Sequence, residues 1–404
     1  MTANNQVAEA RVKYLAEAAG QVLPAGYKYT EIGLIPVDWE VYRLGDRASF
    51  IGSGKTNTKS SGEYPLYGST GLIGSCKNPE YEGEAILVAR VGANAGKLNF
   101  VNGEYGVSDN TILVKLKPEN LIHYYKYWLI RKNLNNLVFG SGQPLITGTQ
   151  IKELLLPLPP EKEQTAIANA LSDVDALINE LEKLIAKKQA IKTATMQQLL
   201  SGRTRLPQFA LHEDGTKKGY KQSELGDIPE DWECVPFGNV MSIRHGKSQK
   251  SVETTDGRYP IFATGGQIGN ASAYLYDKPS VLIGRKGTID KPRYSDTPFW
   301  TVDTLFYSEI KQHADAKFIF YKFCMVDWMQ YNEASGVPSL NASTIESLLT
   351  CLPTRKEQSI ITAILSDMDE EIQTLQQRLI KTRQIKQGMM QELLTGRIRL
   401  VSGE

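Results

Sequence analysis

Two stretches decide the fold of this 404-residue chain: KEQTAIANALSDVD at residues 162–175 and KEQSIITAILSDMD at residues 356–369. They are one segment written twice, and they run on to matching ends, LLSGRTRL at 199–206 and LLTGRIRL at 393–400. Such a long internal duplication predicts a product with pseudo-twofold symmetry. In soluble proteins this symmetry often mirrors a twofold target or a pair of identical partners.

Both stretches have the pattern of a long helix. Their apolar residues recur in steps of four and three, which is the stripe of a coiled-coil seam. Pro159 and Pro160 suit a helix start, and Gly202 and Gly396 suit left-handed C-caps. Each helix of about 40 residues would be about 60 Å long. The seam positions are Ile167, Leu171, Val174, Ile178, Leu181 and Ile185, and Ile361, Leu365, Met368, Ile372, Leu375 and Leu379.

A helix with one narrow apolar stripe must bury that stripe to be stable. The partner we expect is the other copy, packed antiparallel about a twofold axis. The alternative is that each helix packs only on its own globule. Because the pattern outlasts any small globule, it favours the paired helices.

A second repeat marks where each copy begins. GYKYTEIGLIPVDWE at 26–40 matches GYKQSELGDIPEDWE at 219–233. Between this lead-in and each long helix lies a segment of short β-rich runs, turns and one aromatic helical stretch. The two segments share pieces such as YPLYGSTGLIG (64–74) and YPIFATGGQIG (259–269) but otherwise diverge. Near-identical helices with dissimilar globules indicate a common scaffold that carries two recognition globules of different specificity.

The sequence therefore predicts an α+β fold, with two mixed α/β globules joined by two long antiparallel coiled-coil helices in a pseudo-twofold duplication. The expected parts are an N-terminal helical extension at 1–25, a first globule at 26–158, a long helix at 159–202, a linker and lead-in at 203–233, a second globule at 234–352, a second long helix at 353–398 and a tail at 399–404.

Composition narrows the class of protein. Net charge is +1, and residues 41–160 carry 13 Lys/Arg against 9 Asp/Glu, so the first globule is only weakly basic. If it binds DNA phosphate, it would do so through a local basic patch, and a partner protein would contribute part of the binding. No apolar run reaches membrane-spanning length and the N-terminus lacks a signal-peptide core, so we expect a cytoplasmic protein with no membrane partner. Four scattered cysteines suggest reduced thiols rather than a disulfide scaffold. They are Cys76, Cys234, Cys324 and Cys351.

Motifs for catalysis are weak. GSGKT at 52–56 lacks the first glycine of a phosphate-binding loop, since Ser49 holds that place, and a lysine loop that meets DNA phosphate is the better interpretation. NPEY at 78–81 differs by one residue from an amino-methyltransferase loop, but no Gly-rich cofactor loop accompanies it. The four histidines have no metal-ligand spacing. We therefore predict a binding protein with no catalytic or metal-binding residues.

Matched loops of the two globules supply the candidate DNA contacts. Arg90 and Arg285 occupy the same place beside a glycine, and arginine can bridge guanine O6 and N7; pairing with a carboxylate is the commoner alternative for a single arginine. Hydroxyl and amide groups in the other loops can read adenine or bind phosphate. The candidates are Lys55, Thr56, Ser69, Thr70, Arg90, Asn94, Asn110, Thr111 and Gln143 in the first globule, and Arg244, His245, Lys247, Ser248, Thr264, Gln267, Arg285, Lys286, Thr304 and Ser339 in the second.

The repeated SDVD and SDMD inside the helices need an explanation, because Ser and Asp are mediocre helix residues. One interpretation is a docking surface for another subunit, and the alternative is a solvated face left over from duplication. The residues concerned are Ser172, Asp173, Asp175, Ser366, Asp367 and Asp369.

The order of these motifs, met twice, resembles the specificity (S) subunit of type I restriction-modification systems. The resemblance rests on the lead-in G-Y-K-x-[TS]-E-[IL]-G-x-I-P-x-D-W-E, on L-S-D-x-D and on L-L-[ST]-G-R-x-R-L, and it extends from about Gly26 to Leu400. It implies that each globule is a target recognition domain that reads one half of a split, asymmetric DNA sequence. It also implies that the helices act as a ruler between the half-sites.

The same resemblance implies the partners. Two modification subunits would dock on the frame and supply S-adenosylmethionine and adenine methylation, and restriction subunits would add ATP- and Mg-dependent translocation and cleavage. This chain would hold none of these cofactors. Two rival hypotheses are a self-contained DNA methyltransferase or NTPase, which would bind its cofactor alone, and a coiled-coil scaffold with heads for peptide or carbohydrate.

Overall fold

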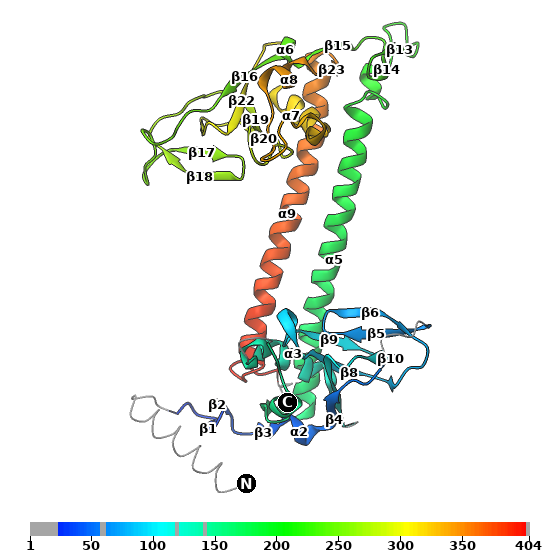
Figure 1. Cartoon of the computed structure of the whole chain (residues 1–404), viewed down its shortest axis with the longest axis vertical. Coiled ribbons are helices and arrows are strands. Elements are labelled where there is room, and N and C mark those ends of the chain that lie inside the picture. The colour runs from blue at the N-terminus through cyan, green and yellow to red at the C-terminus, as the bar shows by residue number, and fades with distance from the viewer. Residues whose placement is uncertain (1–22, 57–61, 118–120, 140–143, 401–404) are drawn as a thin grey trace. The chain divides into compact units, whose positions relative to one another are not determined.

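The computed structural model describes residues 23–56, 62–117, 121–139 and 144–400. The chain divides into two compact units, unit 1 from Met1–Leu181 with Arg378–Glu404, and unit 2 from Glu182–Gln377. Both divisions fall inside the long helices α5 (Glu161–Leu199) and α9 (Arg355–Leu393) (Figure 1). Each unit therefore consists of one globule, the first half of one long helix and the second half of the other. Nearly all of the extension expected at 1–25 lies outside the described residues.

The ends of the long helices agree with their sequence signals. Helix α5 begins directly after Pro159 and Pro160, where missing amide hydrogens cost nothing. Gly202 and Gly396 follow the helices with φ of 73° and 70°. A side chain there would be strained by the backbone and would also come within 2.6 Å and 2.5 Å of the proline rings of Pro229 and Pro36. The glycines thus allow each helix end to pack on a lead-in.

In unit 1 the lead-in forms a hairpin and the globule forms two small sheets. The lead-in strands are β1 (Tyr27–Thr30) and β2 (Gly33–Pro36). One sheet has the order β4-β11-β8-β9, namely Ala48–Ser53, Thr111–Leu116, Ala85–Ala89 and Leu98–Val101. The other has the order β6-β5-β10-β7, namely Gly71–Cys76, Tyr64–Gly68, Glu104–Val107 and Tyr81–Glu82. Strand β3 (Glu40–Arg43) pairs with β12 (Leu155–Leu158), and α2 (Leu44–Arg47), α3 (Ile122–Lys132) and α4 (Gly148–Lys152) complete the globule.

Unit 2 repeats this plan in the same order. Its lead-in strands are β13 (Tyr220–Ser223) and β14 (Gly226–Pro229). Its sheets are β16-β22-β19-β20, namely Met241–His245, Leu305–Ile310, Ser280–Gly284 and Arg293–Ser295, and β18-β17-β21, namely Gly266–Ala271, Tyr259–Ala263 and Trp300–Thr301. Strand β15 (Glu233–Pro236) pairs with β23 (Leu349–Leu352), and the helices are α6 (Phe237–Val240), α7 (Ala316–Cys324) and α8 (Ala342–Ser347).

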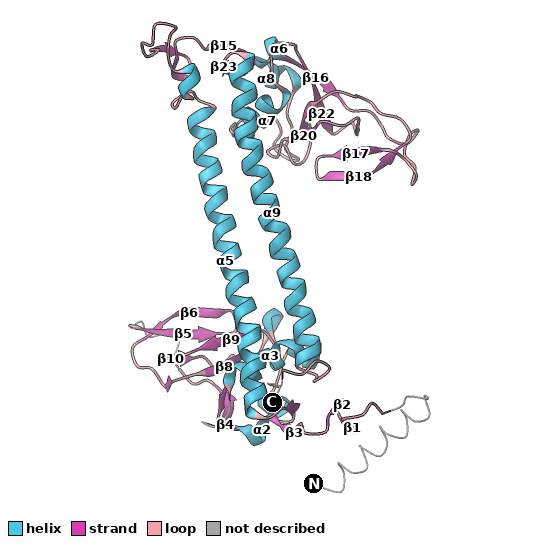
Figure 2. Ribbon diagram, turned by 180° about the vertical axis from the view of Figure 1, so that it is seen from behind, coloured by secondary structure: helices cyan, strands magenta, loops and turns pink. Residues whose placement is uncertain are grey.

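Each core is built from buried residues of the globule and of both long helices, whose backbones are drawn in Figure 2. In unit 1, Ile167 and Leu171 of α5 pack with Met390 and Leu393 of α9 around the aromatic side of α3. In unit 2, the matching cluster holds Ile361 and Leu365 of α9 with residues from the end of α5, which are Met196, Leu199 and Leu200. Because the aromatic helix lies between the sheet and the long helices, it buries apolar surface on both sides. The alternative of a helix packed only on its own globule is therefore wrong.

The helices run antiparallel within each unit. In unit 2, Lys188 pairs with Glu371 at 2.6 Å and Lys192 pairs with Asp369, so partner numbers fall as chain numbers rise. In unit 1, Arg399 beyond α9 pairs with Glu163 and Lys386 pairs with Asp175, in the same sense. Most of the predicted seam residues are buried, and the others are half-buried, namely Val174, Met368, Leu375 and Leu379.

Candidate nucleic-acid interface

In unit 2, four loops that the sequence matched to unit 1 meet on one face of the globule. The backbone of Arg285 at the end of β19 donates to Thr304 O at 2.8 Å, and Lys286 bridges to Ser339. The hairpin turn between β17 and β18 joins them, since the hydroxyl of Thr264 lies 3.5 Å from where a Cβ on Gly287 would stand. These predicted residues therefore form a contiguous polar surface with two cationic side chains.

In unit 1 the corresponding group is centred on Arg90, just after β8. Its amide donates to Asn110 O at 2.9 Å, and its guanidinium donates to Ser53 Oγ at 3.2 Å. Asn94 lies in the short 3-10 helix at Gly92–Asn94, whose first amide bonds to Pro144 O at 3.0 Å. Neither Arg90 nor Arg285 pairs with a carboxylate in the part of the chain that the structure describes. Gln143, predicted in the neighbouring loop, lies outside it.

Two predicted contacts are wrong. Thr56 is 7% exposed and Thr111 is fully buried, so neither hydroxyl can reach a nucleic acid. Thr56 instead donates to Glu80 at 2.9 Å and accepts from the amide of Val107 at 2.9 Å. The sequence placed Thr56 in a glycine-lysine loop and Thr111 at the first residue of a β-rich run. Pairing of β11 with β4 and β8 buries Thr111, and the bond to Val107 of β10 draws Thr56 into the globule.

The remaining candidates lie at the surface in different settings. Ser69 and Thr70 form the turn between β5 and β6. Arg244 forms an ion pair with Glu309 at 2.8 Å, so it follows the commoner alternative for an arginine, which is pairing with a carboxylate. Gln267 is exposed, and its amide donates to Asn270 Oδ1 at 2.9 Å. Lys55, His245, Lys247 and Ser248 are exposed.

The repeated Ser and Asp residues of the long helices serve mainly inside each unit. Tyr127 of α3 donates to Asp175 at 2.8 Å and lies 3.1 Å from Ser172 Oγ, and Lys386 of α9 pairs with Asp175 at 2.6 Å. Tyr321, Ser366, Asp369 and Lys192 repeat this arrangement in unit 2. For Ser172, Asp175, Ser366 and Asp369 the docking interpretation is therefore replaced by an internal network, because an aromatic helix uses their polar groups. Asp173 and Asp367 are exposed.

A mirrored ion cluster closes each unit, and it was not among the residues predicted from the sequence. In unit 2, Arg205 binds Glu357 at 2.8 Å and Asp231 at 2.7 Å, and the Arg205 and Glu357 side chains are only 6% and 2% exposed. In unit 1, Arg399 binds Glu163 and Asp38 in the same way. The sequence did contain a signal for this cluster, because the arginine lies in the repeated R-x-R-L motif and the aspartate in the repeated D-W motif. Arg399 and Leu400, which the sequence assigned to the tail, thus belong to unit 1.

Charge in these clusters shifts the pKa values of the carboxyl groups. Burial raises the pKa of Asp231, but hydrogen bonds and charges from Arg205 and Lys218 outweigh it and bring that pKa to about 2. The hydrogen bond from Arg399 lowers the pKa of Asp38. Both carboxylates are therefore charged at neutral pH and hold their arginines in place.

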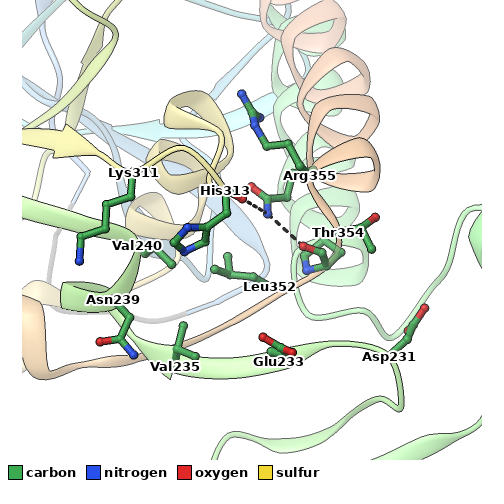
Figure 3. A pocket seen from close by; sticks show the side chains of 12 residues that line it. Asp231, Glu233, Val235, Asn239, Val240, Lys311, His313, Leu352, Thr354 and Arg355 are labelled. Atoms are coloured by element: carbon green, nitrogen blue, oxygen red, sulfur yellow. Dashed lines mark hydrogen bonds between the residues drawn. The ribbon is translucent and has the colours of Figure 1, made fainter.

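A pocket of about 630 Å³ lies beside the unit 2 cluster, at the start of α9 (Figure 3). Gln358 anchors the helix there, donating to His313 O at 3.3 Å and Pro353 O at 3.0 Å. Arg355, at its rim, pairs with Asp315 of the globule. These contacts hold the globule against the start of α9. The Arg355 guanidinium at the pocket rim is already paired with Asp315.

The cysteine expectation is wrong for one pair. Cys234 and Cys351 face each other in the register of β15 and β23 and form a disulfide. They are 117 residues apart in the chain, so no local spacing pointed to them. Cys76 and Cys324 are free thiols.

Within residues 23–400, leaving out the undescribed gaps, no three His, Cys, Asp or Glu side chains gather as metal ligands. Across the same described ranges, no helix is long and apolar enough to cross a membrane.

The fold and this interface define a class of protein: a frame built by duplication, with two related heads whose loops carry different polar side chains. The sequence pattern of the type I restriction modification DNA specificity domain matches residues 36–193 and again 229–383. The chain therefore belongs to this family, and its role is that of a DNA specificity subunit.

Similar proteins support the family over the whole length. The putative type I restriction enzyme MjaX specificity subunit of Methanocaldococcus jannaschii is 27% identical, over 93% of this chain and 97% of that protein. The MjaVIII specificity subunit of the same organism is 25% identical, over 91% and 94%. The crystal structure of the type I restriction-modification S subunit from M. genitalium has the same fold, with a TM-score of 0.64 at 17% identity over 88% of this chain and 96% of that one.

Proposed function

We propose that each globule reads one half of a bipartite, asymmetric DNA target and that the paired long helices set the gap between the halves. The observation that carries this proposal is the contrast between the two units. Their hairpins, ion clusters and helix ends correspond, and so do their sheets apart from the short strand β7, which has no matching strand in unit 2. The side chains on the matched loops differ at most positions, with Arg90 and Arg285 as a shared exception. A duplicated scaffold whose two globules carry largely different loop side chains suits a protein in which each globule recognises a different DNA sequence.

The partners we propose are two modification subunits, with restriction subunits joining through them. Those subunits would bind S-adenosylmethionine, ATP and Mg. This chain would be non-catalytic, and it would act in the cytoplasm. In support, a chain of similar fold, at 15% identity, has been solved in a study of complex assembly and conformational transition of the type I R-M system. Asp173 and Asp367 are exposed and take no part in the internal network, so they remain the candidates for contact with a modification subunit.

The reading of half-sites is tested by exchanging residues 41–158 for the matching globule of a related chain. The chain is co-expressed with its modification subunit, and methylation-sensitive sequencing of the host DNA reports the modified motif. One half-site is expected to change while the other half-site and the gap stay the same. A change in both half-sites would contradict independent readout.

The gap is tested separately by lengthening α5 and α9 together by one helical turn. The half-site bases are expected to stay the same and the gap to grow. If the bases change while the gap stays fixed, the helices do not set the spacing. The isolated chain, mixed with labelled S-adenosylmethionine or ATP, is expected to bind neither, and saturable binding of either would favour a self-contained enzyme.

A further inference from the structure

The hairpins β5–β6 of unit 1 and β17–β18 of unit 2, whose turns carry predicted DNA contacts, are equivalent residue by residue. In unit 1, Tyr67 pairs with Leu72 and Gly68 with Gly71; in unit 2, Phe262 pairs with Gln267 and Ala263 with Gly266. Both hairpins carry a bulge at the same step, between Leu66 and Tyr67 and between Ile261 and Phe262. The backbone that presents the two turns is therefore the same.

Each hairpin is covered by one side chain from the edge strand of the neighbouring sheet. Asn99 on β9 pairs with Leu87, and Arg293 on β20 pairs with Leu282, which is the equivalent leucine. A Cβ added to Gly71 would stand 3.6 Å from Asn99 Oδ1, and one added to Gly266 would stand 3.5 Å from an Arg293 guanidinium nitrogen. The two residues thus occupy one structural position, and neither was identified from the sequence.

The glycine beneath each of them has a structural reason. Gly71 and Gly266 have φ of 103° and 128°, a backbone conformation that strains any other residue. The amide or guanidinium lies at an ordinary contact distance from the place where a Cβ would stand, so it is the backbone conformation, and not lack of space, that calls for glycine. Arg293 is held there by a hydrogen bond of 3.0 Å to Gly265 O. For Asn99, no hydrogen bond of the side-chain amide is found within the described segments, so its donor and acceptor are both available.

In each unit the hairpin that carries this position packs against the loops of the candidate DNA contacts. In unit 2, the same turn carries Thr264, which lies against the loop of Arg285 and Lys286. In unit 1, a Cβ on Gly68 would stand 3.3 Å from Ser108 Oγ, two residues before Asn110. The covered hairpin is therefore continuous with the loops described above.

We propose that Asn99 and Arg293 are matched specificity-determining residues, Asn99 reading adenine in one half-site and Arg293 reading guanine in the other. An amide can pair with adenine N6 and N7, and a guanidinium with guanine O6 and N7, each by two hydrogen bonds. This assignment rests on the proposed function, because it requires that each globule read its own half-site.

The test is reciprocal substitution at the shared position. Chains carrying Asn99→Arg or Arg293→Asn are co-expressed with the modification subunit, and the methylated motif is determined by sequencing. N99R is expected to change one base of one half-site from adenine to guanine, and R293N to change one base of the other from guanine to adenine. Preference for the new base over the old is expected to be about tenfold or more.

A milder variant keeps the proposal testable if an exchange impairs folding. N99A is expected to accept several bases at that one position, with both the remaining bases and the gap unchanged. Matched controls are Asn179→Arg and Arg378→Asn, at exposed positions in the middle of the long helices α5 and α9, which are expected to leave the motif unchanged. An N99A or N99R motif identical to that of the unsubstituted chain would overturn the assignment.

Failure of the assignment can be told apart from failure of the proposed function. If the unsubstituted chain gives a bipartite motif and globule exchange changes one half only, the proposed function stands and the substitutions alone judge Asn99 and Arg293. If a substitution in one globule changes bases in both half-sites, independent reading fails and the assignment fails with it.

Discussion

At the residue scale, the most informative groups are those that the duplication preserved for internal reasons. Arg205 and Arg399 each tie the lead-in to the first turn of a long helix. Tyr127 and Tyr321 each bind a serine and an aspartate in mid-helix. Polar groups that are half-buried must find partners, and this explains why residues of low helix propensity recur in both helices.

The pKa of Asp231 gives a prediction for stability against pH. Its pKa is about 2 in the folded protein against an ordinary value of 3.8, so its contribution is complete above pH of about 4 and is lost as pH falls toward 2. Asp231→Asn is therefore expected to lower the melting temperature near pH 6, with the difference from the unsubstituted chain disappearing at acid pH. Thermal melts of both chains across this range measure it. A difference that is the same at every pH would show that the charge of Asp231 is not responsible.

The aspartates of SDVD can be separated by substitution. Asp175→Asn breaks the ion pair to Lys386 and weakens the bond from Tyr127, and we expect a loss of about 1–2 kcal/mol in the free energy of unfolding. Asp173→Asn, at an exposed position in the same helix, is the control and should change stability by less than about 0.5 kcal/mol. Urea denaturation compares the two. Equal effects would contradict the internal network.

At the element scale, the long helices gain little from their exposed faces and depend on the apolar seam, which is buried both in mid-helix and at the helix ends. The first two seam residues of each are buried in a globule core with the last turns of the other helix. Long helices are stable only with such packing, since propensity alone is weak. This is why the repeated motifs concentrate at the helix ends.

Gly388 offers a direct test of helix propensity within α9. It is exposed, and nothing lies within 4 Å of the place where its Cβ would stand. The matching residue of α5 is Ala194. Gly388→Ala is expected to stabilise the protein by up to about 1 kcal/mol and Ala194→Gly to destabilise it by a similar amount. Urea midpoints measure both; a destabilising G388A would mean that the glycine has a role beyond the helix itself.

At the scale of the whole molecule, equivalent arginines close the two units, but the chain reaches them differently. Arg205 lies within the continuous segment that forms unit 2, whereas Arg399 comes to unit 1 from the distant segment Arg378–Glu404. Tyr220 and Tyr27 bind the backbone of Gly202 and Gly396 in the same way, at 3.1 Å and 2.8 Å. The duplication therefore yields two similar units through exchange of helix ends.

A chain that stops after Leu394 should reveal this exchange. It loses Arg399 and leaves Glu163, which is 2% exposed, with an unpaired buried charge. Unit 1 is expected to lose about 3 kcal/mol or more. Amide hydrogen exchange is the measurement, and faster exchange is expected at 26–40 than in the full chain. Residues 219–233 are the internal control, and equal acceleration in both lead-ins would argue against closure of unit 1 by this segment.

The sequence by itself determined the duplication, the two long helices with their glycine ends, and the family. Periodicity and repeated motifs are local, and local patterns report directly on helices and caps. Tertiary structure alone decided which side chains meet. It buried Thr56 and Thr111, joined Cys234 to Cys351, turned Asp175 inward to Tyr127, and placed Asn99 and Arg293 over matched hairpins. These contacts depend on strand pairing and packing between residues distant in the chain, where the diverged globules offer no spacing from which they could be inferred.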